Sequence, residues 1–453
     1  MVNCLRLLTP ALLAMLWGCS SPESSLQRQF SKTNTGRLQL PAGTMEISEP
    51  LFVPVGATDL EITGDNTVLR ASAEFQGRAM IMIRSARKVR LHGFSIEGNR
   101  ATFSKVTEIP PAEAPFVTHF QGNGIIADDV DGLEMSNIQL REIPGFAVLV
   151  SASQNVTIEK VTVEDSGSSN SKSRNNTSGG ILLEEGVQNF TVRDCTLRKV
   201  LGNGIWTHST YRSPRNYTGQ ITGNRFEMIG RDAIQVGHAN RIRVENNTGH
   251  MIGYPEKTVD VEGGGIPVGI DTAGKVDESV YARNRFEEIN GKCIDLDGFH
   301  DGEVAENVCI NRGAAADYPQ GHFAVVFNNT NQEMQSQNIT VRDNVFDGTK
   351  FGGIFVIGSG HRITGNKLTN INRAKCNESA ATYGCKHFEK EPDLMQAGIY
   401  LGLRAERHHP ANNTLIEGNQ VSGHKMRERC VMAARDPSVH SNTIRNNVCT
   451  DAP

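Results

Sequence analysis

The sequence predicts an all-β protein, built as a single-stranded right-handed parallel β-helix of about ten or more coils. Two strand patterns that alternate along most of the chain lead to this prediction, and the composition supports it. Among 453 residues, 45 are glycine and 6% are aromatic, which is typical of many short strands joined by tight turns. Because short repeats cannot bury an apolar face alone, they stack on their neighbours as a solenoid.

The first pattern places an asparagine after a short apolar strand, as in Ile221–Phe226. Its asparagines are mostly 22–23 or 37–38 residues apart: Asn224, Asn246, Asn284, Asn307, Asn344, Asn366, Asn419 and Asn447. The shorter step fits one three-strand coil, and the longer steps indicate inserted loops. We expect each asparagine to tolerate the left-handed conformation at a turn and to bond to its equivalents in neighbouring coils.

The second pattern is small–apolar–x–apolar, and its alignment gives rows of residues that cross the coils. With the first apolar residue inward, the next residue faces outward. This outward row reads Trp206, Gln235, Pro267, Asp295, Val326, Phe355 and Tyr400. Two residues further on, the row reads His208, Gly237, Gly269, Asp297, Asn328, Ile357 and Gly402.

The row that precedes each inward residue contains only small side chains: Gly204, Ala233, Gly265, Cys293, Ala324, Gly353 and Gly398. We interpret it as outward-facing and closely covered. One interpretation is a groove floor that admits a sugar chain, walled by Trp206, Asp295, Phe355 and Tyr400, because aromatic faces and carboxylates suit sugars. The other is that inserted loops such as 311–321 or 372–396 pack there.

The N-terminus has the features of an export signal. Residues 1–18 combine a short basic start with an apolar stretch too short to cross a bilayer. Leu16–Cys19 resembles a bacterial lipobox, with Cys19 as the lipidated residue, although Trp17 is unusual there and leaves ordinary signal-peptidase cleavage open. We expect 19–35 to be a tether and 36–453 to be the β-helix domain. The protein would then be an exported cell-envelope lipoprotein, at the outer membrane or facing the periplasm, held to the membrane through its lipid anchor.

The net charge of the chain argues against one class of binding partner. A net charge of −4 with mixed signs gives no basic footprint for nucleic acid.

The cysteines indicate disulfide bonds. Cys376 and Cys385 bracket a short loop and form the first candidate disulfide. Cys430 with Cys449, and Cys293 with Cys309, are further candidate pairs, which leaves Cys195 as a buried small side chain. No cysteine–histidine spacing supports zinc, so no metal site is predicted.

Three segments resemble the opening of pectate-lyase-like β-helix proteins: Leu40–Ile47, Leu60–Gly64 and Phe94–Arg100. The resemblance spans about residues 36–448 and implies the fold together with polysaccharide chemistry. Polygalacturonase motifs such as Asn-Thr-Asp and Gly-His-Gly are absent, and Gly298–Asp301 shares only the last two residues of an epimerase Asp-Pro-His-Asp motif. The resemblance to pectate lyases leaves calcium open, with Asp295, Asp297 and Asp301 as ligands and Lys292 or Arg231 as base.

Asp295 and Asp297 are the central catalytic candidates. On a regular strand they share one face about 6.5–7 Å apart, and two carboxylates that close can split their pKa values into an acid and a base. Asp232, Asp271 and His300 complete the catalytic set, whereas Asp301 is interpreted as a turn former.

The substrate-binding candidates are Trp206, His208, Gln235, His322, Asn328, Phe355 and Tyr400. These residues favour an enzyme that acts on a polysaccharide or oligosaccharide without a cofactor, with glycoside hydrolysis ahead of lyase or epimerase action. The alternative is a non-catalytic glycan-binding or structural surface lipoprotein.

Overall fold

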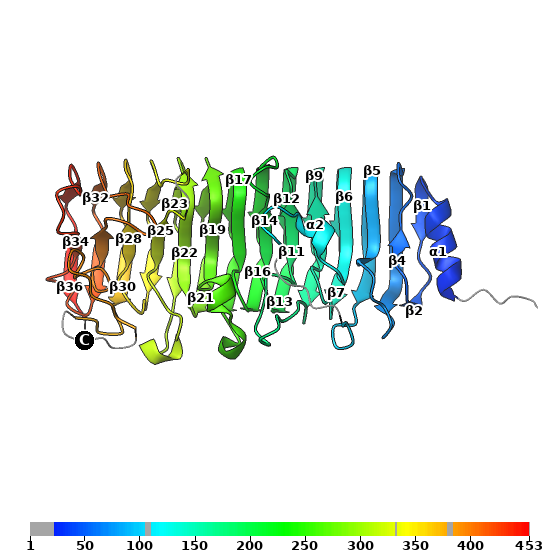
Figure 1. Ribbon diagram of the computed structural model, residues 1–453, viewed down its shortest axis with the longest axis horizontal. Helices are drawn as coiled ribbons and strands as arrows, with labels where there is room; N and C mark the ends of the chain where they lie inside the picture. Colours follow the sequence, from blue (N-terminus) through cyan, green and yellow to red (C-terminus); the bar gives the residue numbers. More distant parts are fainter. Residues whose placement is uncertain (1–21, 105–109, 331–332, 378–383, 453) are drawn as a thin grey trace, which may run out of the picture.

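The computed structural model describes residues 22–104, 110–330, 333–377 and 384–452. The strands wind into one long coil with three faces, each a parallel sheet (Figure 1). In this part of the chain, no helix has the length and apolar character needed to cross a membrane. The predicted right-handed parallel β-helix is confirmed.

Sheet I carries the candidate site and runs through β3 (Leu51–Phe52), β5 (Ala79–Glu97), β6 (Asn123–Ser136), β8 (Val148–Ser151), β11 (Ile181–Glu184), β14 (Ile205–His208), β17 (Ile234–Glu245), β19 (Val268–Asp277), β22 (Lys292–His300), β25 (Val325–Asn328), β28 (Ile354–Val356), β31 (Ile399–Leu401) and β34 (Val431–Ala433). Several of these strands are long and bend into the next sheet.

Sheet II adds β1 (Gly36–Gln39), β4 (Thr58–Ala71), β9 (Gln154–Glu159), β12 (Gln188–Arg193), β15 (Asn216–Thr222), β20 (Val280–Ala282), β23 (Glu303–Ala305), β26 (Thr340–Arg342), β29 (Arg362–Thr364), β32 (Leu415–Glu417) and β35 (Thr443–Arg445). Sheet III adds β2 (Gly43–Ile47), β7 (Gln139–Arg141), β10 (Thr162–Glu164), β13 (Thr196–Val200), β16 (Arg225–Ile229), β18 (Thr248–Ile252), β21 (Arg285–Ile289), β24 (Val308–Ile310), β27 (Val345–Asp347), β30 (Lys367–Ile371), β33 (Gln420–Gly423) and β36 (Val448–Asp451). The helices are α1 (Pro22–Lys32), α2 (Phe116–His119), η1 (Glu256–Thr258), α3 (Val261–Gly264) and η2 (Ala315–Asp317).

The core is a set of apolar ladders inside the coil. In sheet I, Ile205, Ile234, Ile270 and Ile294 pair in register on successive strands and are fully buried. Neighbouring parallel strands lie about 4.8 Å apart, so each inward side chain packs on its equivalent one coil away.

A ladder of buried asparagines follows the corner between sheets II and III. Asn224, Asn247 and Asn284 bond in series, with each Nδ2 donating to the next Oδ1 at 2.9–3.0 Å. The predicted bonding between coils is confirmed, but Asn247 occupies the rung that was assigned to Asn246. The left-handed conformation falls on the preceding residue, with φ of 57° at Asn246 and 56° at Arg283.

The row of small residues faces the interior rather than the outside. A Cβ on Gly204 would lie 2.8 Å from the ring of Phe226, and Ala233, Cys293 and Ala324 belong to the core. The chain turns into sheet I at this point and brings these positions against side chains of sheet III. Neither a groove floor nor a loop contact therefore explains the row.

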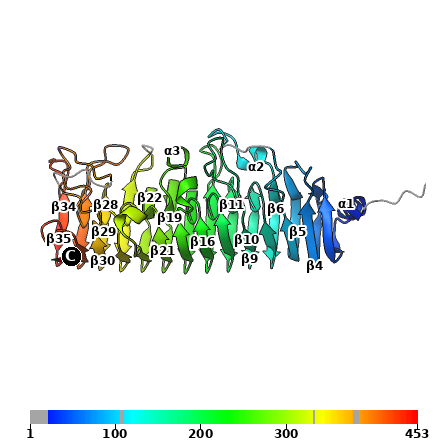
Figure 2. The ribbon, with the colours of Figure 1, turned by 90° about the horizontal axis from the view of Figure 1, so that it is seen from below.

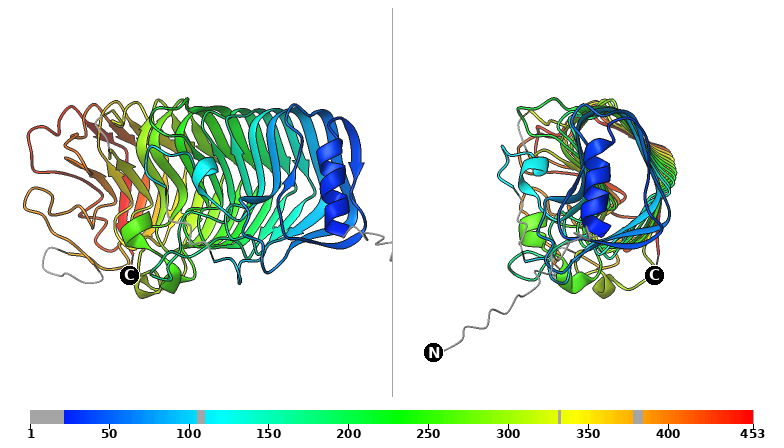
Figure 3. Two further views of the ribbon diagram at one scale, coloured as in Figure 1. Left: turned by 45° about the vertical axis from the view of Figure 1, so that its right-hand side comes forward. Right: turned by 90° about the vertical axis from the view of Figure 1, so that its right-hand side faces the viewer.

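The first described residues form a cap rather than a tether. Helix α1 lies across the open end of the coil (Figure 3) and buries Leu26 and Phe30 against the first strands. The Glu23 carboxylate accepts a hydrogen bond from the Ser48 hydroxyl at 2.8 Å. The expected tether over 19–35 is therefore wrong for residues 22–32, which cover core that would otherwise meet water. The signal segment 1–18 and Cys19 lie outside the described residues.

All three expected disulfides are present: Cys293–Cys309, Cys376–Cys385 and Cys430–Cys449. Cys195 is free and buried. Such a set is typical of proteins that fold in an oxidising compartment.

Candidate active site

The register of sheet I places three polar side chains side by side on its outer face. Gln235 of β17 pairs with Asp271 of β19, and Asp271 pairs with Asp295 of β22. The prediction that Pro267 stands in this row is wrong, because Asp271, four residues later, holds that position. Pro267 lies in the turn before β19, because proline has no N–H to donate within a parallel ladder.

The same four-residue shift corrects the two neighbouring rows. Gly269 takes the place of Gly265 in the small row, and Ala273 stands between Gly237 and Asp297 in the second outward row. Asp271 therefore moves from the edge of the candidate site to its centre.

Four acidic side chains gather around one lysine at this centre. Asp232 precedes β17, Asp271 lies on β19, and Asp295 and Asp297 lie on β22. The Lys292 ammonium donates to Asp295 Oδ2. The exposed fractions of Asp232, Asp271 and Asp295 are only 3%, 9% and 5%, so water screens these charges poorly.

Hydrogen bonds fix the orientation of the outer-face residues. Asn203 Nδ2 donates to Gln235 Oε1 at 2.6 Å, and Gln235 Nε2 donates to Asp271 Oδ2 at 2.8 Å. On β22, Asp297 accepts from the Thr330 backbone N–H at 2.8 Å and from its hydroxyl at 2.5 Å. Gln235 thus binds a catalytic candidate rather than standing free in a groove.

Burial and mutual repulsion alter the acidity of the group. Burial raises the pKa of Asp232 to about 6, although the adjacent Arg231 opposes the rise. Burial and repulsion from Asp232 and Asp295 raise the pKa of Asp271 well above its ordinary value. Burial also raises the pKa of Asp297, against its bonds from Thr330.

The lysine is held in its charged form. Burial lowers the pKa of Lys292, but attraction to Asp295, the hydrogen bond to it and attraction to Asp271 outweigh burial, so the pKa is raised overall. A lysine that keeps its proton is a poor general base. The expectation that Lys292 could act as base is therefore not favoured.

On the N-terminal side of the acids, α2 covers sheet I. Phe116 of α2 packs 4.9 Å from the ring of Trp206 and 5.1 Å from that of His208, centroid to centroid. Trp206 is buried in this satellite apolar cluster. Figure 2 shows α2, α3 and the C-terminal loops along one side of the coil. At this rung the alternative of loop packing holds, and Trp206 and His208 do not line an open groove.

On the C-terminal side, the row continues with Val326, Phe355 and Tyr400, and all three are buried. The Phe355 and Tyr400 rings stack at 6.4 Å between centroids. Residues 384–406 border a cavity of about 580 Å³ that also touches Val326 and Phe355. Phe355 therefore lines a pocket, whereas Tyr400 is fully buried and does not line it.

Two other predicted substrate contacts also line this pocket, His322 and Asn328. Asn328 pairs in register with Asp297, so the pocket begins one coil from the acids. Burial lowers the pKa of His322 to about 3, and repulsion from Lys292, Lys350 and Lys386 adds to the effect. The imidazole is accordingly neutral near pH 7.

His300 and Asp301 lie apart from the acids. His300 is five residues beyond Asp295 on β22, about 16 Å along an extended strand. Its Nδ1 stands 3.4 Å from Asp277, which also binds Arg215. Asp301 has a φ of 47° and accepts a bond from Asn338, as a turn former does. His300 therefore does not belong to the acid cluster.

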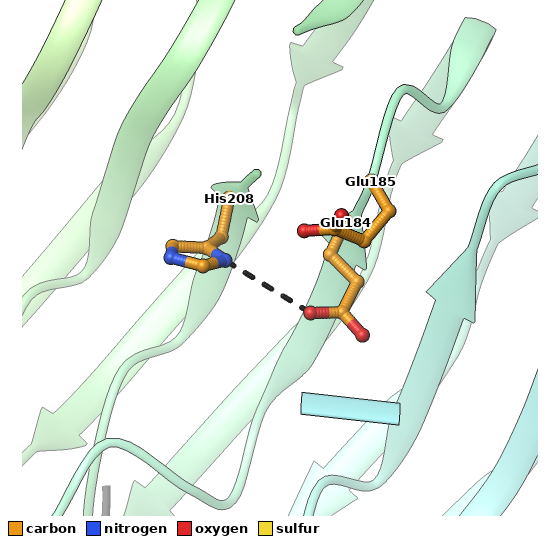
Figure 4. Close-up of side chains that lie close together, drawn as sticks. All are labelled: Glu184, Glu185 and His208. Atoms are coloured by element: carbon orange, nitrogen blue, oxygen red, sulfur yellow. Dashed lines mark ion pairs between the residues drawn. The ribbon is translucent and has the colours of Figure 1, made fainter. Parts of the chain in front are cut away.

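The described residues contain one set of side chains whose ligand atoms all lie within 4.8 Å of one another, as a metal site requires: Glu184, Glu185 and His208 (Figure 4). The Glu184 oxygens accept the backbone N–H groups of Phe116 and Val117 at 2.9 and 2.6 Å. We therefore assign Glu184 to holding α2 in place. Asp295, Asp297 and Asp301 do not converge in this way.

The comparisons with known proteins agree with the fold. The family described as right-handed beta helix region matches residues 46–268. None of the curated proteins matches the chain.

Among solved structures, the Dettilon tailspike protein is similar with a TM-score of 0.52 and 14% identity, over 76% of this chain and 62% of the tailspike chain. The surface adhesin PfbA of Streptococcus pneumoniae has a TM-score of 0.49 and 11% identity, over 88% and 85%. The A-module of a mannuronan C-5 epimerase from Azotobacter vinelandii has a TM-score of 0.48 and 13% identity, over 95% of each chain. The match over residues 46–268 and the parallel pairing of the strands place the chain in the right-handed parallel β-helix fold.

Proposed function

We propose that the acids around Lys292 form the active site of a glycan-hydrolysing enzyme. The observation that carries this proposal is the pairing of Asp271 with Asp295 on adjacent coils, where burial and repulsion from the neighbouring acids raise the pKa of Asp271 well above its ordinary value. Most glycoside hydrolases use two carboxyl groups whose surroundings give them different pKa values, so that one acts as an acid and the other as a base or nucleophile. The fold alone does not select this activity.

The two carboxyl groups take different roles. Asp271 is the general acid that protonates the leaving oxygen, and Gln235 fixes one of its oxygens as a hydrogen-bond acceptor. Asp295 supplies the partner carboxylate, with its negative charge balanced by Lys292. Asp232 and Asp297 add negative charge nearby, which favours the protonated form of Asp271.

Lyase or epimerase action is the weaker alternative. Both reactions begin with removal of a proton from a ring carbon, which needs a strong base near the sugar. Lys292 keeps its proton, and burial together with nearby lysines lowers the pKa of His322 to about 3. These observations favour hydrolysis.

Asp271→Asn and Asp295→Asn test the proposal on a panel containing a neutral glucan, an amino-sugar polymer, pectate and alginate. We expect either substitution to lower the release of reducing ends by about 10²–10⁴-fold, the usual contribution of acid–base groups. Asp301→Asn is the matched control, because this exposed acid lies in a turn that asparagine tolerates. Undiminished turnover in both variants would contradict the site. Binding without turnover in the wild type would favour the glycan-binding alternative.

Export and lipid anchoring remain part of the proposal. The three disulfides support an oxidising compartment. Cys19→Ser should move the protein from the membrane fraction to the soluble fraction of fractionated cells. Equal distribution of the two forms would contradict an anchor at Cys19.

A further inference from the structure

The polar stretch of the outer face is short and is closed at both ends. Three coil steps separate Gln235 from Val326, which is about 14 Å at the spacing of parallel strands. Beyond Gln235 the row becomes Trp206, Leu182 and Leu149, all buried beneath α2. A glycan that contacts acids on successive coils runs across the strands, and α2 stands in its path.

Helix α2 with the residues packed beneath it, here called the N-terminal stop, is held firmly in the fold. Its apolar contacts join Phe116 and Phe120 to Phe146 and Trp206. The fully buried Glu184 carboxylate accepts both Phe116 N–H and Val117 N–H. Burial raises the pKa of Glu184, while His208 and these two N–H groups oppose the rise. The segment is therefore held by packing and by hydrogen bonds together.

The segment 384–406, here called the C-terminal stop, is also held by a buried carboxylate that accepts a backbone N–H. The buried Glu391 accepts the Leu403 backbone N–H at 2.9 Å, and the Cys376–Cys385 disulfide closes the segment that precedes Glu391. Leu394 and Met395 of this region border the cavity of about 580 Å³. This volume lies in the range of small-ligand sites.

The pocket has a surface suited to a sugar ring. Phe388 on its wall is 45% exposed, although large apolar side chains are usually covered. Asn328 and His322 supply polar groups on the side nearer the acids. A sugar ring stacked on Phe388 would share the pocket with these polar groups.

We infer that the site acts on the end of a glycan chain or on a short oligosaccharide, with terminal sugar units in the pocket beside Phe388. This inference rests on the proposed hydrolysis, since it concerns the same acids. The interior of a chain that ran across the acids would meet α2 on one side and the segment 384–406 on the other.

The test follows the products of cleavage on the panel polymers and on oligosaccharides that carry a label at the reducing end. We expect reducing ends to accumulate while viscosity stays nearly constant, with mono- or disaccharide released from the first time points. A fall in viscosity in step with cleavage would overturn the chain-end inference and leave hydrolysis intact.

Failure of hydrolysis gives a different result. No turnover, together with binding of short oligosaccharides by both the wild type and Asp295→Asn, would overturn hydrolysis but support the pocket. Neither turnover nor binding would overturn both.

Opening the N-terminal stop sharpens the test. Glu184→Gln removes one acceptor of the α2 N–H groups, and Phe116→Ser removes the ring against Trp206. We expect either variant to raise the viscosity-lowering share of cleavage several-fold, with Thr118→Ala, an exposed residue of α2, as the control. An unchanged product pattern in folded Phe116→Ser would count against α2 as the stop.

Discussion

The outer face of sheet I contains two kinds of region that share one backbone geometry. In the middle, Gln235, Asp271 and Asp295 are polar and hydrogen-bonded or ion-paired. On the flanks, Leu182, Trp206, Val326, Phe355 and Tyr400 hold equivalent positions and are apolar or aromatic. An outward position on a coil is therefore not necessarily exposed to solvent. Loops turn the flanks into a second apolar core, and the polar residues between the flanks are also buried.

Lys292→Met should have the largest effect on stability, because it removes the cation that balances the acids between the two flanks. It leaves Asp295 unpaired among three further acids, and removing one partner of a buried ion pair costs about 3–5 kcal/mol. We expect the free energy of unfolding, measured by denaturant titration at pH 7, to fall by this order, and to fall less at pH 4.

Lys350→Met is the matched control for that substitution. Lys350 is also buried, but it donates only to the carbonyls of Tyr318 and Pro319, and no carboxylate in the described chain pairs with it. Burial lowers its pKa. An equal loss of stability in both variants would show that the ion pair is not what distinguishes Lys292.

Asp232→Asn should reveal the strain of the acid cluster through its pH dependence. Because the pKa of Asp232 is raised to about 6 in the fold, its protonated form stabilises the protein below about pH 4, and that stability is lost as pH rises through 6. The variant stays neutral, so its Tm should match the wild type at pH 4 and exceed it by roughly 2–4 °C at pH 8. A constant difference at both pH values would contradict a raised pKa.

The sequence predicted the coils and the polar middle more reliably than the flanks. Recurring apolar positions determine the ladders, and acids at two outward positions of one rung made Asp295 and Asp297 candidates. The predicted rung of Gly265 and Pro267 lies four residues before the true rung of Gly269 and Asp271. The two are hard to separate because Ile266 and Ile270 both follow a glycine. The missing N–H of Pro267 was the signal that separates the two registers.

The flanks could not be derived because loops from distant positions cover them. Nothing near Trp206 in sequence indicates that Phe116, 90 residues earlier, packs on its ring. The same is true of Phe355 and residues 384–406. Strand periodicity specifies which face of the sheet a side chain points to. Whether a loop covers that face depends on tertiary contacts, which the local sequence does not encode.

Tyr400→Phe should have the smallest effect on stability, and it tests whether the C-terminal flank is a purely apolar core. The Tyr400 hydroxyl is buried without a hydrogen-bond partner in the described chain, so its removal relieves an unsatisfied polar group. We expect the free energy of unfolding to stay level or to rise by up to about 1 kcal/mol. Tyr281→Phe is the matched variant, because that hydroxyl bonds to Thr272 Oγ1 at 2.8 Å and its loss should cost about 1 kcal/mol. Equal losses in the two variants would mean that the Tyr400 hydroxyl has a polar partner, so that this flank is not a purely apolar second core.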